Sequence, residues 1–233
     1  MPTIQVNDIP LYYEVHGEGQ QLALIVGLGI DISEWDGIIR WLAQRNRIIA
    51  FDNRGAGRSG KPDLPYTIAM MANDTDGLLR ALGIERADIL GVSLGGRIAL
   101  ALALEHPERV NKLILVSTSA RVPRRPWWFG LLGLISSAPI FRSKYPQPRY
   151  AFLRQRDAST RFDCTARLPE IHAPTLILHG KSDRIAPYAL AEELRAGIAG
   201  SRLLPFAGGH LFFLMREPQR FLETVARFLS EDD

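Results

Sequence analysis

Short apolar runs alternate with amphipathic segments along most of the chain, a pattern typical of an α/β sheet with helices on its faces. Eight runs are predicted as strands: residues 3–6, 11–15, 22–26, 47–51, 87–92, 113–117, 175–179 and 202–206. Residues 22–26 are wholly apolar and residues 47–51 are apolar after Arg47, which indicates strands buried on both faces. Helices are predicted from about residue 33 and over about 67–82, 94–105, 188–198 and 219–229. Ser33 is the expected N-cap of the first helix, with Trp35, Ile38, Ile39 and Leu42 on its buried face.

Residues 121–170 interrupt this alternation. They hold six of the fifteen prolines and no run that reads as a buried strand. We therefore predict a core of residues 1–120 and 171–233, with a short, partly helical cap (residues 121–170) inserted over the edge of the sheet. This cap holds ten basic and three acidic residues, a net +7 in a chain of net charge +3. Such a basic segment suits an acidic partner or substrate, although a solvated surface explains the charge equally well.

Composition excludes several other classes of protein. At 233 residues, with 46% hydrophobic and 23% charged residues, the chain is long enough to bury a core and is not disordered. The single cysteine, Cys164, excludes an internal disulfide and a thiolate metal cluster. The first residues do not resemble a signal peptide, and no apolar run reaches the ~20 residues of a membrane span. We expect a soluble cytoplasmic protein with neither a membrane nor a nucleic-acid partner.

Residues 91–95, Gly-Val-Ser-Leu-Gly, match the motif Gly-x-Ser-x-Gly where a predicted strand meets a predicted helix. A nucleophile elbow needs this setting, because the turn exposes a serine hydroxyl beside the free N–H groups of a helix N-terminus. The motif alone is weak, since glycine and serine are common. Its position between strand and helix makes Ser93 the candidate nucleophile.

A serine nucleophile needs a histidine base and an acid that holds the histidine in one tautomer. In elbow architectures the chain order is serine, then aspartate or glutamate, then histidine. His210, in the loop after the last predicted strand, and Asp183, after the strand 175–179, satisfy that order. With Ser93 they fall at the carboxyl ends of strands, where open α/β sheets place their sites. The other histidines are poorly placed or precede the acid: His16, His106, His172 and His179.

An oxyanion hole needs two backbone N–H groups aimed at the oxygen of the tetrahedral intermediate. The residue after the nucleophile, Leu94, is one candidate, and Leu28, between two glycines after the third predicted strand, is the other. The Gly55-x-Gly57 loop lacks the lysine and serine of a phosphate-binding loop, so a structural turn is the favoured interpretation. We expect no cofactor and no metal.

With these motifs the chain resembles the α/β-hydrolase superfamily, in particular small capped esterases and lactonases of the 3-oxoadipate enol-lactonase type. The resemblance rests on residues 26–29 with Trp35, 51–59, 91–96, 106–110, 179–183 and 209–210. It implies an α/β-hydrolase fold with an eight-stranded, mostly parallel sheet, and a cofactor-free Ser–Asp–His hydrolase. The chain departs from some relatives: Val26 replaces a common histidine. The serine nucleophile argues against dehalogenases and epoxide hydrolases, and Leu211 replaces the lysine of hydroxynitrile lyases.

We therefore expect hydrolysis of a small-molecule carboxylic ester or lactone through an acyl-enzyme. The same triad can cleave carbon–carbon bonds in vinylogous diketones or run perhydrolysis. The basic cap also suits an acidic carrier protein, as in the pimeloyl-carrier-protein methyl-ester esterases that the chain could resemble. A non-catalytic ligand-binding protein on a hydrolase fold is the alternative from a different class, and the intact triad argues against it.

Overall fold

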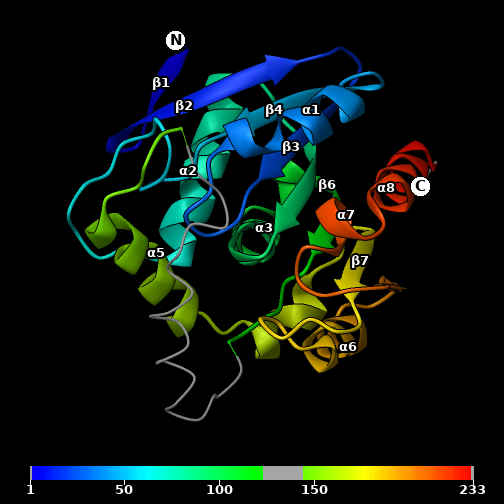
Figure 1. Ribbon diagram of the computed structural model, residues 1–233. Helices are drawn as coiled ribbons and strands as arrows, with labels where there is room; N and C mark the ends of the chain where they lie inside the picture. Colours follow the sequence, from blue (N-terminus) through cyan, green and yellow to red (C-terminus); the bar gives the residue numbers. More distant parts are fainter. Residues whose placement is uncertain (1, 123–143, 232–233) are drawn as a thin grey trace.

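A sheet forms the centre of the computed structural model, which describes residues 2–122 and 144–231 (Figure 1). Its strands are β1 (Thr3–Val6), β2 (Ile9–His16), β3 (Gln20–Ile25), β4 (Asn46–Phe51), β5 (Ala87–Val92), β6 (Val110–Val116), β7 (Thr175–Gly180) and β8 (Arg202–Phe206). Across the sheet they run β1-β2-β4-β3-β5-β6-β7-β8. The pairings from β4 to β8 are parallel, and β2 is antiparallel to both neighbours. The described residues thus confirm the predicted eight-stranded, mostly parallel sheet.

Helices cover both faces of this sheet. One face carries α1 (Asp36–Leu42), α7 (Phe212–Met215) and α8 (Pro218–Ser230); the other carries α2 (Ile68–Ala81), α3 (Leu94–Glu105) and α6 (Tyr188–Gly197). Strand β3 shows why two layers are needed: Leu22 and Leu24 join one apolar cluster, and Ala23 and Ile25 join the other. Successive side chains point to opposite faces, so a strand without polar positions must be covered twice.

The first helical segment begins differently from the prediction. A 3₁₀ turn, η1 (Ile32–Trp35), precedes α1, and Asp31 is its N-cap. The Asp31 carboxylate accepts a hydrogen bond from Ser33 N at 2.9 Å and another from the Ser33 hydroxyl. The predicted N-cap role of Ser33 is therefore wrong. The helical segment begins at Ile32, so the carboxylate of Asp31 caps it and Ser33 lies within its first turn. The predicted apolar face is confirmed, since all four of its residues are buried: Trp35, Ile38, Ile39 and Leu42.

The predicted cap is only partly within the described residues, because residues 123–143 lie outside them. Its described part holds α5 (Arg149–Arg161) and the 3₁₀ helix η3 (Thr165–Glu170), and η2 (Pro107–Arg109) follows α3 in the core. In Figure 1, α5 lies at one side of the molecule, and Arg97 of α3 donates a hydrogen bond to Ser159 of α5. The boundaries 121–170 stay a prediction. None of the described helices combines the length and the apolar character that crossing a membrane requires.

Candidate active site

Ser93 lies in a sharp turn between β5 and α3. Its φ is +55° and its ψ is −112°, a backbone conformation that a residue with a side chain adopts only under strain. The turn is held because Ser93 N donates to Val116 O at 2.9 Å and the Thr118 hydroxyl donates to Ser93 O at 2.7 Å. Gly95 allows α3 to approach β3, since a Cβ there would lie 2.0 Å from Ile25 O. The local sequence therefore produces the expected elbow.

His210 reaches Ser93 from the loop that follows β8. Its Nε2 lies 2.9 Å from the Ser93 Oγ, across 117 residues of sequence. The loop is tied to the centre of the sheet, because the Ser117 hydroxyl donates to His210 O at 2.8 Å. His210 is thus held at the carboxyl end of β5 through contacts of both its side chain and its backbone.

Asp183 lies on the opposite side of this imidazole, in the loop after β7. Its Oδ2 is 2.7 Å from His210 Nδ1, and its Oδ1 accepts hydrogen bonds from the amides of Ile185 and Ala186 at 2.8 and 2.9 Å. Burial opposes ionisation, but hydrogen bonds from His179 and His210 outweigh it, so the pKa of Asp183 lies well below its ordinary value. The carboxylate is charged throughout the neutral pH range.

The protonation pattern follows from these contacts. An ionised carboxylate only accepts hydrogen bonds, so His210 Nδ1 must carry a hydrogen and donate it in a hydrogen bond to Asp183. In the neutral ring, Nε2 is then an acceptor and receives the proton of the Ser93 hydroxyl. The three predicted residues, Ser93, Asp183 and His210, therefore form one continuous chain of hydrogen bonds. This arrangement can transfer a proton away from the serine oxygen.

His179 is a further neighbour of this hydrogen-bond chain, and the sequence does not predict a role for it. It is fully buried at the end of β7, and its Nε2 lies 2.7 Å from Ala186 O and 3.4 Å from the Asp183 Oδ2. It precedes the acid in the chain, so the residue order of the triad excludes it as the base. Its spacing of four residues before Asp183, at the end of the same strand, is the signal that could have pointed to a role beside the carboxylate.

The two predicted oxyanion donors lie on either side of the nucleophile. Leu94 is the first residue of α3, and Leu28 follows Gly27, where a Cβ would lie 3.6 Å from the Ser93 Cβ. Within residues 2–122 and 144–231, neither Leu28 N nor Leu94 N has a hydrogen-bond acceptor. Gly29 N, in contrast, donates to the Gln155 side chain at 3.1 Å. Both predicted amides therefore lack an acceptor among the described residues, and their role as oxyanion donors stays a prediction.

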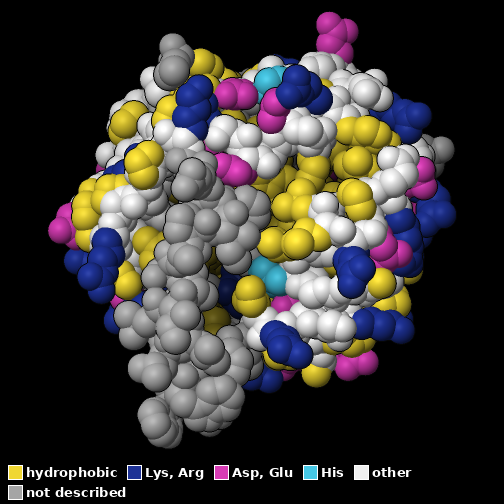
Figure 2. Space-filling model, viewed as in Figure 1, with side chains coloured by type: hydrophobic (Ala, Val, Ile, Leu, Met, Phe, Trp, Pro, Cys, Tyr) yellow, Lys and Arg dark blue, Asp and Glu magenta, His cyan; other side chains and the backbone are white. Residues whose placement is uncertain are grey.

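The surface near these loops is largely apolar. Figure 2 shows hydrophobic side chains gathered across the middle of this face, over the region between α1 and α7, with a histidine side chain at their lower border. Partly buried hydrophobic residues of the nearby loops are Leu28, Ile30 and Leu211; in α7, Leu214 is partly buried and Met215 is 76% exposed. Such a lining favours a substrate with an apolar part.

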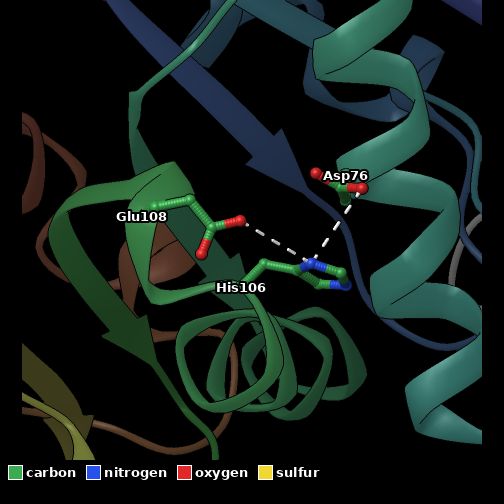
Figure 3. Close-up of side chains that lie close together, drawn as sticks. All are labelled: Asp76, His106 and Glu108. Carbon is green, nitrogen blue, oxygen red and sulfur yellow. Dashed lines mark ion pairs between the residues drawn. The ribbon is translucent and has the colours of Figure 1, made fainter.

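One group of side chains in the described residues has the composition of a metal site: Asp76, His106 and Glu108 (Figure 3). His106 Nδ1 faces the two carboxylates at 4.0 and 3.9 Å, and its Nε2 lies 2.8 Å from the Asn73 Oδ1. Arg109 Nε forms an ion pair with the Asp76 carboxylate at 2.7 Å. A guanidinium satisfies this carboxylate, so the group is better described as an ion-pair network than as a cation site.

The Gly55-x-Gly57 loop is a structural turn, as predicted. Ala56 N donates to Asn53 O at 2.9 Å, and Gly55 N donates to Gly60 O at 2.9 Å. Asp52, directly after β4, is buried and accepts a hydrogen bond from Arg58 N at 2.8 Å. These three backbone donors are thus used within the protein, which leaves the loop poorly suited to a phosphate.

Comparison with known proteins identifies the class to which this fold and site belong. Residues 15–139 match a family described as the alpha/beta hydrolase fold. The chain belongs to this family and is a hydrolase. It is 31% identical, over the whole of both chains, to a protein of Azorhizobium caulinodans named carbamate hydrolase RutD.

Two solved structures carry the same fold. An enol-lactonase from Burkholderia xenovorans superposes with a TM-score of 0.86 at 28% identity, covering 99% of this chain and 100% of its own. An esterase from Exiguobacterium antarcticum superposes with a TM-score of 0.87 at 28% identity, covering 98% and 99% of the two chains. The resemblance to the α/β-hydrolase superfamily and its esterases and lactonases is thereby confirmed.

Proposed function

We propose that this protein hydrolyses small carboxylic esters or lactones through a covalent acyl-enzyme. The observation that carries the proposal is the unbroken hydrogen-bond chain from Ser93 Oγ through His210 to Asp183, with contacts of 2.9 and 2.7 Å. A serine in an ordinary turn has no need of a buried carboxylate, an oriented imidazole and a strained backbone. The three together match the requirements of nucleophilic catalysis.

In the first half-reaction, the Ser93 Oγ attacks the substrate carbonyl carbon while its proton passes to His210 Nε2. The carbonyl oxygen becomes an oxyanion, which the N–H groups of Leu28 and Leu94 stabilise. Asp183 stabilises the imidazolium without accepting its proton. The tetrahedral intermediate collapses as His210 returns that proton to the leaving alkoxide, which departs as the alcohol. A lactone opens in the same step, and its alcohol end stays attached through the acyl chain.

The second half-reaction reverses these roles with water. His210 takes a proton from a water molecule, whose oxygen attacks the Ser93 ester carbon. The second tetrahedral intermediate then expels the Ser93 oxygen, which recovers its proton from His210. The products are a carboxylic acid and the free enzyme, and no cofactor is consumed.

The substrate class is proposed from the site and its relatives together. The relatives are named for a carbamate, an enol-lactone and an ester, and hydrolysis of each begins with attack on an acyl carbonyl. A panel of p-nitrophenyl acetate and butyrate, simple lactones and a p-nitrophenyl carbamate therefore covers the main possibilities. A vinylogous diketone and hydrogen peroxide extend the panel to carbon–carbon hydrolysis and perhydrolysis, the other reactions open to this triad. We place the reaction in the cytoplasm.

An acidic carrier protein is a less supported partner. Several arginines of residues 121–170 already pair with carboxylates: Arg121 with Glu193, Arg154 with Asp63, Arg156 with Asp157, and Arg167 with Glu105. These pairs lower the positive field that a carrier would meet, which favours the interpretation of a solvated surface. Arg124, Arg125 and Arg142 lie outside the described residues. Salt-sensitive binding to acyl carrier protein would support such a partner.

The proposal is tested by turnover of the panel in Ser93→Ala. We expect its kcat to fall by about 10⁴-fold or more, because without the nucleophile only binding and the oxyanion donors remain. Ser182→Ala is the matched control, since Ser182 is exposed in the Asp183 loop. A fluorophosphonate probe should label the wild-type protein and not Ser93→Ala. Undiminished turnover in Ser93→Ala, or a wild-type protein that binds esters without cleaving them, contradicts the proposal.

A further inference from the structure

The buried face of α5 is unusually polar for a helix packed on a core. Its buried residues are Ala151, Gln155, Ala158 and Ser159, which fall on one stripe at helical spacing. Two alanines supply little apolar area, so hydrogen bonds from the two polar residues determine how the helix sits. Both polar residues point toward segments that surround Ser93.

Gln155 makes three hydrogen bonds and is fully buried. Its Nε2 donates to Arg54 O at 2.6 Å, and its Oε1 accepts from Gly29 N at 3.1 Å and from Gln147 Nε2 at 3.0 Å. The orientation of the amide is unambiguous, because Arg54 O can only accept and Gly29 N can only donate. The side chain thus joins two loops at the carboxyl end of the sheet, those after β3 and β4.

The loop after β3 contains a tight turn. Ile30 N lies 3.4 Å from Gly27 O, and Gly29 has a φ of +72°, as in a type II turn. Types I and II differ by a flip of the central peptide, here the one between Leu28 and Gly29. The hydrogen bond from Gly29 N to Gln155 fixes that peptide in one orientation. It also removes Gly29 N as a donor to substrate.

We propose that Gln155 is a positioning residue, which anchors the turn after β3 from α5 through Gly29 N, so that Leu28, one residue earlier in the same turn, keeps its N–H beside Ser93 as an oxyanion donor. The inference rests on the proposed function and deepens it. Gln155 touches neither the substrate nor the reacting atoms. It acts through the backbone of the loop, and it makes one half of the oxyanion site depend on the docking of α5.

Ser159 supplies a matched control. It lies one helical turn after Gln155, and its Oγ receives a hydrogen bond from Arg97 Nη1, while Arg97 Nη2 donates to the Ser119 hydroxyl at 2.8 Å. This contact docks α5 on the core without touching the loop after β3. Ser159→Ala therefore weakens docking alone, whereas Gln155→Met weakens docking and releases the Gly29 peptide.

The experiment measures kcat, KM and the inhibition constant of phenylboronic acid in the wild type, Gln155→Met and Ser159→Ala. The boronic acid forms a tetrahedral adduct with a serine oxygen and so reports on the oxyanion site. For Gln155→Met we expect kcat to fall about 10- to 100-fold with KM within about threefold, since a displaced donor loses contacts made only in the transition state. The inhibition constant should rise by a similar factor, and Ser159→Ala should stay within about threefold of the wild type in all three.

Thermal unfolding first establishes that each variant is folded at the assay temperature. If Gln155→Met is not folded, Gln155→Asn replaces it with the same expected result, because its amide is one methylene too short to hold Gly29 N. A variant that raises KM without lowering kcat, or that matches Ser159→Ala in every constant, overturns the inference. The proposed function fails separately, by a wild type without turnover or by an active Ser93→Ala.

Discussion

Helix α3 has a group of histidine and carboxylate side chains at each of its ends, and only one of the two is arranged for catalysis. Ser93 precedes the helix and begins the chain of contacts to His210 and Asp183. His106 ends the helix and faces the two carboxylates drawn in Figure 3. The residue types are nearly the same, so composition does not distinguish the two ends.

The difference lies in what surrounds each carboxylate. Asp183 is contacted by two backbone amides and two imidazoles. Asp76 is contacted by Arg109 Nε at 2.7 Å and Arg80 Nη1 at 3.5 Å, and its histidine stays 4.0 Å away. A guanidinium is permanently charged, so it neutralises Asp76 whatever the histidine does. Asp183 keeps its charge available for the imidazolium that forms during reaction.

Removing the base is expected to have the largest effect. His210→Ala should lower kcat by about 10⁵-fold or more, because Ser93 then has no group to take its proton. The double variant Ser93→Ala/His210→Ala should be no slower than either single variant, since members of one triad act as a unit. The measurement is p-nitrophenyl butyrate turnover at high enzyme concentration. Additive losses in the double variant would show that the two side chains work independently.

Asp183→Asn comes next. The substitution keeps the size of the side chain and removes the charge that fixes the Nδ1–H tautomer, so kcat should fall by about 10³- to 10⁴-fold. Asp76→Asn provides the comparison at the other end of α3 and should leave kcat within about twofold, because its ion pairs are remote from Ser93. Equal losses in the two variants would mean that Asp183 acts only on folding.

The wild type and Asp183→Asn should also differ in how their stability depends on pH. The pKa of Asp183 is lowered in the folded state relative to the ordinary value of about 3.9, so its contribution is complete above that value and is lost as pH falls toward the folded pKa. The wild type should be more stable than Asp183→Asn at pH 7, and the difference should shrink below about pH 4. Urea unfolding at a series of pH values measures it. A difference that grows on acidification contradicts the assigned shift.

The elements and the three site residues could be predicted because both depend on local pattern and topology. Largely apolar strands that alternate with amphipathic helices predict a central sheet, and residues that follow parallel strands meet at one edge. That reasoning selected Ser93, Asp183 and His210, which the structure brings within hydrogen-bond distance, although their catalytic role stays a prediction.

What escaped prediction depends on how segments dock. The role of Gln155 is invisible in its own helix, because its partners are backbone atoms of loops 101 and 126 residues away. His179 was judged by chain order alone, and only the turn after β7 brings it against Asp183. The N-cap prediction at Ser33 was wrong on a smaller scale, because the helical segment begins earlier, at Ile32, with Asp31 as its N-cap. Side-chain pattern identifies elements, and tertiary contacts decide which polar atoms meet.

A smaller effect is expected at His179. His179→Phe keeps an aromatic ring and removes the Nε2–H, which lies 2.7 Å from Ala186 O and 3.4 Å from Asp183 Oδ2, so the pKa of that carboxyl should rise toward its ordinary value. Losing a hydrogen bond to a charged group should lower kcat about tenfold. His179→Gln places an amide nitrogen near the lost Nε2 and should recover most of the activity. Equal loss in both variants would indicate a packing defect rather than a missing donor.

The smallest effect should come from His106, which tests the comparison from its inactive end. His106→Gln should leave kcat within about twofold and cost about 1 kcal/mol of stability or less, because its contact with Asn73 is exposed. Zinc ions should not raise the thermal midpoint of the wild type, since a cation at Asp76 would have to displace the Arg109 guanidinium. The measurement is thermal unfolding with EDTA or with added zinc ions. A zinc-dependent increase that disappears in His106→Gln would reveal a metal site at this end of α3. The two ends of α3 would then both be functional sites, one for an ester and one for a metal ion.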